Sequence, residues 1–358
     1  MHHEHILIIR FSAIGDVAMT VPVVWALARQ YPDLRITMLS RPFARPFFEN
    51  LAPNVNFMAA DLKKEYHGVK GLNALYRRLT AKQFTAVADL HNVLRSDYLR
   101  LRFNLGHYRV EHINKHRDQR RRLTAPQPKK VLKPLFTPFE NYADVFRRLG
   151  YPISEENLCF ESIFPKKGDL SCLPQAIGCK GSQEQWIGLA PFAAHRGKTY
   201  PAELTLQLIE QLLRNKPHAR LFLFGRGPQE DDFFAQCTQR WPQCTQVSQH
   251  AENLSQELIL MSHLDIMVSM DSSNMHLASL TATPVVSIWG ATHPYAGFMG
   301  WHQKEDYALQ INDLDCRPCS IYGNKPCLRG DYACLYGIQP EMILETINKV
   351  LTKTLDKQ

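Results

Sequence analysis

Short, continuous apolar runs alternate with segments of helical periodicity in two separate stretches of the chain. The first stretch holds predicted strands at 5–10, 34–40 and 84–91, and predicted helices at 17–30 and 139–150. The second stretch holds predicted strands at 185–192, 219–225, 264–271 and 282–290, and predicted helices at 201–215, 253–263 and 341–351. Apolar strands that alternate with helices are typical of parallel sheets covered on both faces. The pattern therefore predicts an α/β fold with two parallel sheets.

A segment without periodicity separates the two stretches. Residues 166–184 contain glycine, proline and scattered polar residues, which is typical of a linker. We therefore expect one domain at 1–165, a second at 185–338, and a last helix within 339–358. In parallel α/β sheets, ligands collect at the carboxyl ends of the strands, so we expect a binding cleft between the two domains.

Composition narrows the class of protein. Hydrophobic residues make up 45% of the 358 residues, which is enough for two packed cores and argues against a disordered chain. No stretch approaches the roughly 20 apolar residues of a membrane helix, and MHHEHILIIR is too short in apolar residues for a signal peptide. The nine cysteines are an odd number and are mostly scattered, which favours a reducing compartment. We therefore expect a cytoplasmic protein.

Positive charge is concentrated in one region. The net charge is +8, and residues 100–133 are rich in arginine and lysine with few acids. We interpret them as an exposed basic segment. Its charge fits a solvated surface, an acidic small-molecule or lipid-linked partner, or nucleic acid. No helix-turn-helix, zinc-finger or RNP pattern accompanies it, so nucleic acid ranks last.

The first predicted strand runs into SAIGD, residues 12–16, before a helix begins. Gly15 permits close backbone approach. Asp16 either caps the helix by accepting backbone N–H groups or serves as a general base that takes a proton from an incoming hydroxyl. The glycine spacing is not G-x-G-x-x-G, so a dinucleotide fingerprint is not supported.

Two further strand ends carry polar or small residues. The strand at 264–271 ends in Asp271, Ser272 and Ser273, where hydroxyls and free N–H groups at a helix start suit a phosphate. WGATHP, 289–294, ends the next strand in a small-residue turn. The alternative is a purely structural role, in which these residues cap the helix and His276 is hydrogen-bonded in the core.

Two loops of the second stretch carry charged candidates. Lys198 lies between a strand and the helix at 201–215, and can neutralise a phosphate leaving group or be an ordinary surface lysine. Glu230, in GRGPQE at 225–230, can accept hydrogen bonds from ribose hydroxyls.

In their order along the chain, SAIGD, KTYP, GRGPQE, DSSNMH and WGATHP resemble the heptosyltransferases of glycosyltransferase family 9, which build the lipopolysaccharide core. The resemblance extends over nearly the whole chain. It implies a GT-B architecture, in which two Rossmann-like domains with parallel sheets face each other across a cleft. It further implies that the acceptor binds the N-terminal domain, an ADP-sugar binds the C-terminal one, and the last helix crosses back to the first domain.

The resemblance also implies roles for residues. Asp16 matches the proposed general base, and Lys198 matches the lysine that contacts the donor phosphate and sugar. The positions implied at the donor are Glu230, Asp271, Ser272, Ser273, His276, Gly290 and Thr292. The positions expected at an acidic acceptor are Ser12, Gly15, Arg120 and Arg121. Ser273 and the stretch 192–194 depart from the family pattern, which bears on the donor more than on the reaction class.

The implied activity is an inverting, metal-independent transfer of heptose, or a related sugar, from an ADP-sugar to the lipopolysaccharide inner core. The implied partners are the ADP-sugar, an acidic lipid A-linked acceptor and, by peripheral contact, the cytoplasmic face of the inner membrane, with no cofactor required. The alternatives are a family member with another donor or acceptor, and a non-catalytic anion- or nucleic-acid-binding protein on a transferase scaffold.

Four of the cysteines cluster near the C-terminus, at Cys316, Cys319, Cys327 and Cys334. The first pair has the C-x2-C spacing of a zinc half-site, and four thiolates can complete a tetrahedral structural site. Reduced thiols or a disulfide are the alternatives. Nothing nearby resembles an open catalytic coordination sphere, so any metal here would be structural.

Overall fold

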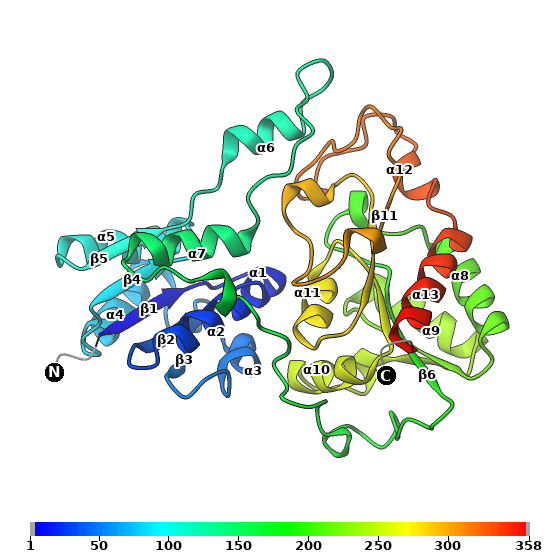
Figure 1. Ribbon diagram of the computed structural model, residues 1–358, viewed down its shortest axis with the longest axis horizontal. Coiled ribbons are helices and arrows are strands. Elements are labelled where there is room, and N and C mark those ends of the chain that lie inside the picture. Colours follow the sequence, from blue (N-terminus) through cyan, green and yellow to red (C-terminus); the bar gives the residue numbers. More distant parts are fainter. Residues whose placement is uncertain (1–3, 356–358) are drawn as a thin grey trace. The chain divides into compact units, whose positions relative to one another are not determined.

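The computed structural model describes residues 4–355 and divides them into two compact units (Figure 1). The first unit takes in the chain up to Lys115 and then Phe136–Ile163, and the second takes in His116–Leu135 and the chain from Phe164 onward. The chain therefore enters the second unit early, returns to the first, and leaves it again. Residues 116–135 belong to the second unit, whereas the sequence analysis assigned them to the first domain.

The first unit contains a five-stranded parallel sheet in the order β3-β2-β1-β4-β5. Its strands are β1 (His5–Ile9), β2 (Arg35–Ser40), β3 (Val55–Ala59), β4 (Ala86–Asp89) and β5 (Arg109–His112). Its helices are α1 (Ile14–Ala18), α2 (Val21–Gln30), α3 (Arg45–Phe48), α4 (Gly68–Thr80), α5 (Leu94–Leu105) and α7 (Pro138–Arg148). Every residue of β1 is buried, which explains its continuous apolar sequence.

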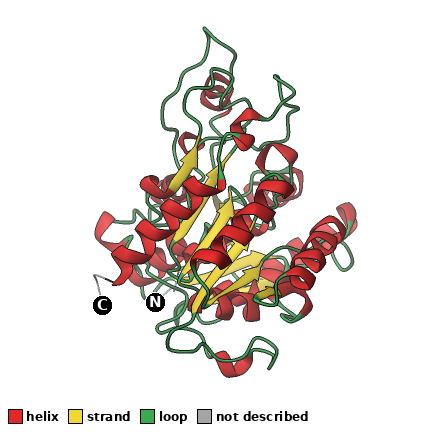
Figure 2. Ribbon diagram, turned by 90° about the vertical axis from the view of Figure 1, so that its right-hand side faces the viewer, coloured by secondary structure: helices red, strands yellow, loops and turns green. Residues whose placement is uncertain are grey.

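The second unit contains a six-stranded parallel sheet in the order β11-β10-β9-β6-β7-β8. Its strands are β6 (Gln185–Ala190), β7 (Ala219–Leu223), β8 (Cys244–Gln246), β9 (Ile266–Met270), β10 (Val285–Trp289) and β11 (Ala308–Gln310). Its helices are α6 (Arg117–Leu123), α8 (Ala202–Asn215), α9 (Pro228–Arg240), α10 (Leu254–His263), α11 (Ser273–Leu280), α12 (Ala333–Tyr336) and α13 (Pro340–Leu355). Figure 2 shows strands flanked by helices.

Several elements differ from the sequence predictions. The helix predicted over 17–30 is two helices, α1 and α2, because Pro22 stands in the first turn of α2 and cannot donate a backbone hydrogen bond to the preceding turn. The basic segment predicted over 100–133 is not one exposed stretch. Arg100 and Arg102 are only partly exposed in α5, and Arg109 in β5 is exposed but forms an ion pair with Glu4.

Helix α13 packs on α8, β9 and β10, all of the second unit, and its apolar side chains join the core of that unit. The family resemblance, by contrast, implies that this helix crosses back to the first domain. Ile343 and Ile347 are fully buried there, which gives α13 its amphipathic pattern. No helix within residues 4–355 is long and apolar enough to cross a membrane.

Candidate active site

The order of each sheet identifies the position at which a ligand can bind. In the first sheet, β1 is followed in sequence by β2 on one side, while β4 lies on its other side. In the second sheet, β6 is followed by β7 on one side, while β9 lies on the other. At such switch points, the loops after the two adjacent strands diverge and leave room for a ligand. The predicted residues Asp16, Lys198 and Asp271 all follow strands that border these two points.

Asp16 lies in the first turn of α1, directly after β1. Its Oδ2 accepts a hydrogen bond from the backbone N–H of Ala13 at 3.2 Å and lies 2.8 Å from Nη2 of Arg10. Asp16 is thus a helix-capping residue, which was the structural alternative to a catalytic role, and it is also one partner of an ion pair. Its side chain keeps about a third of its surface exposed, at 34%, so a substrate hydroxyl can still reach the carboxylate.

Arg10 is the buried partner of this pair. Its side chain is 9% exposed, and its Nη1 donates to the carbonyl of Leu90 at 2.6 Å. Burial alone would lower the pKa of Arg10, but Tyr142 and Asp16 more than offset it, so the net pKa is raised. The guanidinium is therefore a fixed positive charge beside the carboxylate, and it favours the ionised form that a general base requires.

His91 follows β4 on the other side of this switch point. Its Nε2 lies 3.5 Å from Oγ of Ser12, and its ring packs edge-on against Phe11. Burial, with the nearby charge of Arg10, lowers the pKa of His91 to about 3. His91 is therefore neutral at physiological pH. Ser12, a predicted acceptor-binding residue, therefore lies beside this neutral ring, two residues before α1 begins.

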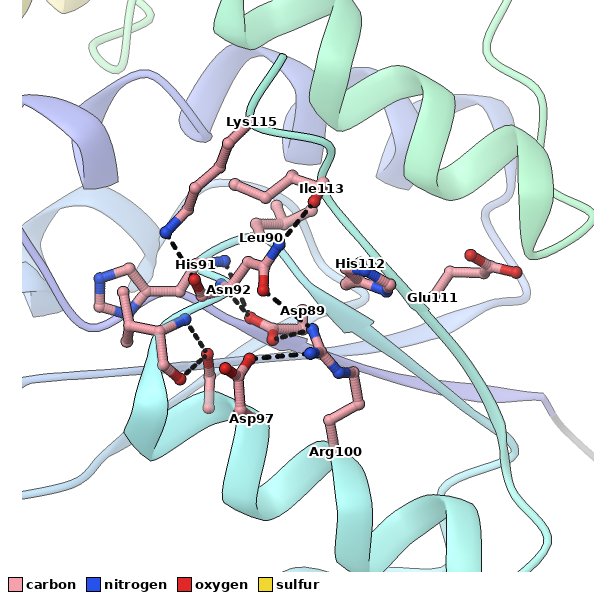
Figure 3. A network of polar contacts seen from close by, with 12 residues as sticks. Asp89, Leu90, His91, Asn92, Asp97, Arg100, Glu111, His112, Ile113 and Lys115 are labelled. Carbon is pink, nitrogen blue, oxygen red and sulfur yellow. Dashed lines mark hydrogen bonds and ion pairs between the residues drawn. The ribbon is translucent and has the colours of Figure 1, made fainter. Parts of the chain in front are cut away.

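A polar network holds the loop that carries His91 (Figure 3). Asp89, at the end of β4, is fully buried, and its Oδ1 accepts the backbone N–H groups of His91 and Asn92, each at 2.9 Å. Its Oδ2 meets Nη1 of Arg100 at 3.2 Å. Lys115 Nζ donates to the carbonyl of Asn92 at 2.5 Å. These contacts tie the loop to the end of β4, to α5 and to Lys115.

In the second unit, Lys198 and Asp271 lie together at the switch point between β6 and β9. Lys198 Nζ lies 3.5 Å from Oδ2 of Asp271, and the two side chains are 15% and 5% exposed. That buried oxygen of Asp271 has no hydrogen-bond partner within residues 4–355. A buried carboxylate oxygen held only by a long ion pair can accept a hydrogen bond from a ligand hydroxyl.

Close backbone packing sets the position of Lys198. The backbone N–H of Ala291 donates to the carbonyl of Gly197 at 2.9 Å. A β-carbon on Gly290 would lie 2.6 Å from that same carbonyl oxygen and 2.6 Å from Leu335 Cδ2. Gly290 is therefore required by packing. It permits the loop after β10 to lie directly against the loop that carries Lys198.

The remaining predicted residues after β9 differ in accessibility. Ser272 is the N-cap of α11, and its hydroxyl lies 3.2 Å from that of Ser269. Ser273 begins the helix, and both serines are partly exposed. His276, one turn further along, is 7% exposed. The two hydroxyls and the first turn of α11 therefore form the accessible part of this predicted site.

Glu230 lies in the first turn of α9, after β7. Its carboxylate lies over a turn formed by Gly225 and Gly227, whose φ angles are +159° and +152°. A β-carbon on Gly227 would lie 3.0 Å from Glu230 Oε2. Burial raises the pKa of Glu230, and the backbone N–H of Arg226 partly offsets this effect. The glycines leave room for the carboxylate to lie across the end of the strand.

Arg317 is a residue that the sequence analysis did not identify, and it holds the turn after β10. Its Nε donates to the carbonyl of Gly290 at 2.6 Å, and its Nη2 donates to the carbonyl of Thr292 at 2.9 Å. Thr292 is fully buried, and no hydrogen bond to its hydroxyl is found within residues 4–355. Gly290 and Thr292, which we predicted to touch the donor, therefore make their polar backbone contacts to Arg317.

The four clustered cysteines line one pocket beside Arg317. Burial raises the pKa of the Cys334 thiol to about 11. Burial and the neighbouring thiols of Cys316 and Cys327 raise the pKa of Cys319. All four are free thiols, and residues 4–355 contain no group of three or more histidine, cysteine or acidic side chains arranged to hold a metal ion. The structural zinc site therefore stays a prediction from spacing.

The predicted acceptor residues fall into two places. Ser12 and Gly15 belong to the first unit, and Gly15 is buried in α1. Arg120 and Arg121 lie on α6, which belongs to the second unit. Arg120 contacts the hydroxyl of Tyr322, and the side chain of Arg121 is 82% exposed. Neither unit by itself brings these four residues together.

Comparisons with known proteins agree on one family. The model of glycosyltransferase family 9 (heptosyltransferase) matches residues 72–325. The lipopolysaccharide core heptosyltransferase OpsX of Haemophilus influenzae is 23% identical over 315 residues, which cover 81% of this chain and 80% of the relative.

Two solved structures share the fold. A family 9 glycosyltransferase from Veillonella parvula matches with a TM-score of 0.75 and 18% identity, over 99% of this chain and 98% of that one. The ADP-heptose lipopolysaccharide heptosyltransferase II of E. coli matches with a TM-score of 0.68 and 19% identity, over 98% and 99%. The two α/β units, each with a parallel sheet, confirm the GT-B architecture. Because the family model also matches most of the chain, the chain belongs to glycosyltransferase family 9, the heptosyltransferase family.

Proposed function

We propose that this protein transfers heptose from ADP-heptose to an acceptor in the lipopolysaccharide inner core, with inversion at the anomeric carbon and without a divalent metal. One observation carries the proposal: a carboxylate paired with a buried arginine lies at one switch point, and a lysine–aspartate pair lies at the other. The heptosyltransferase relatives support the donor and the acceptor class.

Asp16 acts as the general base in this proposal. It takes the proton of the acceptor hydroxyl while that oxygen attacks the anomeric carbon of the donor. The glycosidic bond to the nucleoside diphosphate breaks in the same step. A single displacement needs one base and no protein nucleophile, so the configuration inverts. Arg10 keeps the carboxylate ionised before each turnover.

Lys198 neutralises the departing diphosphate in the second unit. An ammonium placed beside a developing negative charge supplies the stabilisation for which other transferases use a metal ion. Asp271 holds Lys198 near the end of β9 and accepts a hydrogen bond from a donor hydroxyl. The first turn of α11, with Ser272 and Ser273, adds backbone N–H groups and hydroxyls for the phosphates.

The nucleoside is recognised at Glu230 in this proposal. Its carboxylate lies at the end of β7, across the Gly225–Gly227 turn, where it can accept hydrogen bonds from both ribose hydroxyls. We propose that the acceptor is acidic and linked to lipid A, and that the reaction takes place at the cytoplasmic face of the inner membrane.

The test uses Asp16→Asn and Lys198→Met, each with a matched exposed control, Asp33→Asn and Lys349→Met. Asp16→Asn should lower kcat by about 10²–10⁴, and calorimetry should show unchanged ADP binding, because the proposed donor residues all lie in the other unit. Lys198→Met should lower both ADP affinity and kcat. Chelator treatment should leave the wild-type rate unchanged.

Near-wild-type turnover of Asp16→Asn would overturn the general-base assignment. Tighter binding of UDP, GDP or CDP than of ADP would retain the glycosyltransferase assignment and overturn the ADP-heptose donor. Loss of activity on chelation, restored by Mg²⁺ or Mn²⁺, would overturn the metal-independent step.

A further inference from the structure

Most of the net positive charge of the chain lies in one short segment of the second unit. We call residues 116–135 the basic arm. The arm contains seven arginines and lysines and one acid, Asp118, so it carries +6 of the net +8 charge. It consists of α6 followed by a loop with three prolines. Figure 1 shows the helix and the loop that follows it.

Two of the seven cations fix the arm to the body of the second unit. Arg120 donates to the hydroxyl of Tyr322 at 2.6 Å and lies over the ring of Phe298. Lys130 Nζ donates to the backbone carbonyls of Asp315 and Pro318 at 2.9 and 3.2 Å. These contacts hold both α6 and the loop, so the arm presents a defined surface.

The other five cations lie on the exposed side of the arm. They are Arg117, Arg121, Arg122, Lys129 and Lys133. The single carboxylate contact found for them within the described residues joins Arg121 to Asp118 at 3.9 Å, with both side chains more than 80% exposed. Such a pair contributes little. The described residues therefore leave most of the charge of this surface uncompensated, which fits an anionic partner.

Two aliphatic side chains lie among these cations. Val131 and Leu132 are 41% and 51% exposed, and they stand between Lys129 and Lys133 in the loop. Cations beside exposed aliphatic residues are typical of segments that bind the interface of an anionic bilayer, where the cations meet headgroups and the apolar side chains enter the acyl boundary. Nucleic acid fits less well, because the arm contains no phenylalanine, tyrosine or tryptophan on which bases could stack.

We propose that the basic arm docks this protein on a bilayer that contains anionic lipids. The cations contact lipid phosphates, and Val131 and Leu132 enter the headgroup boundary. The inference deepens the proposed function, on which it rests, because it assigns a surface to the membrane contact of an enzyme whose proposed acceptor is lipid-linked. Vesicle binding without donor or acceptor tests this surface independently of catalysis.

The experiment is sedimentation of the full chain with phosphatidylcholine vesicles, with and without phosphatidylglycerol. Each cation near an anionic surface contributes about fivefold in affinity. The triple variant Arg117→Gln, Lys129→Gln, Lys133→Gln should therefore bind anionic vesicles about 100-fold more weakly. The matched control changes three exposed lysines outside the arm: Lys64→Gln, Lys82→Gln, Lys349→Gln. It removes the same charge and should bind nearly as the wild type does.

A second variant separates the two parts of the surface. Val131→Ser with Leu132→Ser should weaken vesicle binding but leave its dependence on salt unchanged, since all cations remain. Equal binding to neutral and anionic vesicles, or equal losses in the arm and control triples, would overturn the proposal. Binding of an RNA or DNA oligonucleotide in place of vesicles would overturn it in favour of nucleic acid. Loss of transfer activity with intact vesicle binding would count against the proposed function alone.

Discussion

A buried arginine and a half-exposed aspartate share one ion pair at the end of β1, and their unequal burial determines what each can do. Arg10 has its guanidinium bound by Leu90 and Asp16, so it cannot move to follow a substrate. Asp16 remains accessible. We infer that Arg10 is a positioning residue, which acts on the reaction only through the charge and orientation of Asp16.

Arg10→Met tests this inference. Loss of a charge-assisted hydrogen bond costs about 1.5–3 kcal/mol, so kcat/KM should fall about 10- to 100-fold. A carboxylate without its neighbouring cation binds a proton more tightly, and the acidic limb of the pH–rate profile should therefore move to higher pH. Arg10→Lys, which keeps the charge, should restore part of the rate. An unshifted pH profile in Arg10→Met would reduce Arg10 to a structural role.

His91 links stability to pH. Its pKa is lowered by burial to about 3 in the folded protein, against about 6.5 when unfolded. Below pH 6.5 the unfolded chain takes up this proton and the folded one does not. The free energy of unfolding should therefore fall as the pH drops from about 6.5 to about 3, by up to about 1.4 kcal/mol per pH unit.

Urea unfolding of the wild type and His91→Gln between pH 7 and pH 5 measures this contribution. The variant should lose less stability over that range, although it is less stable at pH 7. The stability that neutral His91 contributes is fully present above pH 6.5 and is lost progressively below it. The free energies of unfolding of the two proteins should therefore converge on acidification. Parallel curves would show that another group, such as His293, whose pKa burial also lowers, dominates the acid sensitivity.

At the scale of elements, the four strands that the sequence analysis did not predict are the four edges of the two sheets: β3, β5, β8 and β11. The interior strands are buried on both faces and read as apolar runs. An edge strand such as β5, Arg109–His112, has no buried residue and a polar sequence, and β8 and β11 have three residues each. Their backbone pairing depends on a neighbouring strand and leaves little trace in hydrophobic periodicity.

The same reasoning explains which site residues could be predicted. Asp16, Lys198 and Asp271 follow buried strands, so parallel-sheet geometry alone directs attention to them. Arg10 directly follows β1, and a charged residue at that position indicates only that the strand has ended. The partners of Arg317 are distant in sequence: Gly290 stands 27 residues away. Contacts of that kind are set by tertiary packing, which no local pattern reports.

Gly290→Ala tests how closely the loops after β6 and β10 must pack. The added carbon would lie 2.6 Å from both Gly197 O and Leu335 Cδ2, so the loops must separate. Overpacking of this kind costs about 1–3 kcal/mol of stability. We expect a lower unfolding midpoint and weaker ADP binding, because Lys198 is displaced. Gly181→Ala, where the added carbon meets only Glu184 Cβ at 3.7 Å, is the control and should change neither. Unchanged ADP affinity in Gly290→Ala would show that this packing does not affect the donor site.

At the scale of the whole molecule, the two units are joined by more than one passage of the chain. The polypeptide crosses at Lys115–His116, returns at Leu135–Phe136 and crosses again at Ile163–Phe164. The second unit is therefore discontinuous in sequence, and its basic arm is inserted into the first unit's sequence. The boundary expected near 165 agrees with the last of these crossings. The first two crossings are not marked by any change in composition other than the basic charge of the arm.

This chain path has a consequence for synthesis. The arm leaves the ribosome long before the residues that anchor it: Lys130 and its acceptor Pro318 are 188 residues apart. At about 5–20 residues per second, roughly 10–40 s pass before that partner exists. A segment that waits this long is safest when it is charged and poor in apolar residues. The arm contains seven cations and few apolar residues besides Val131 and Leu132, so the same lysines and arginines that suit an anionic surface also make nascent chains repel one another.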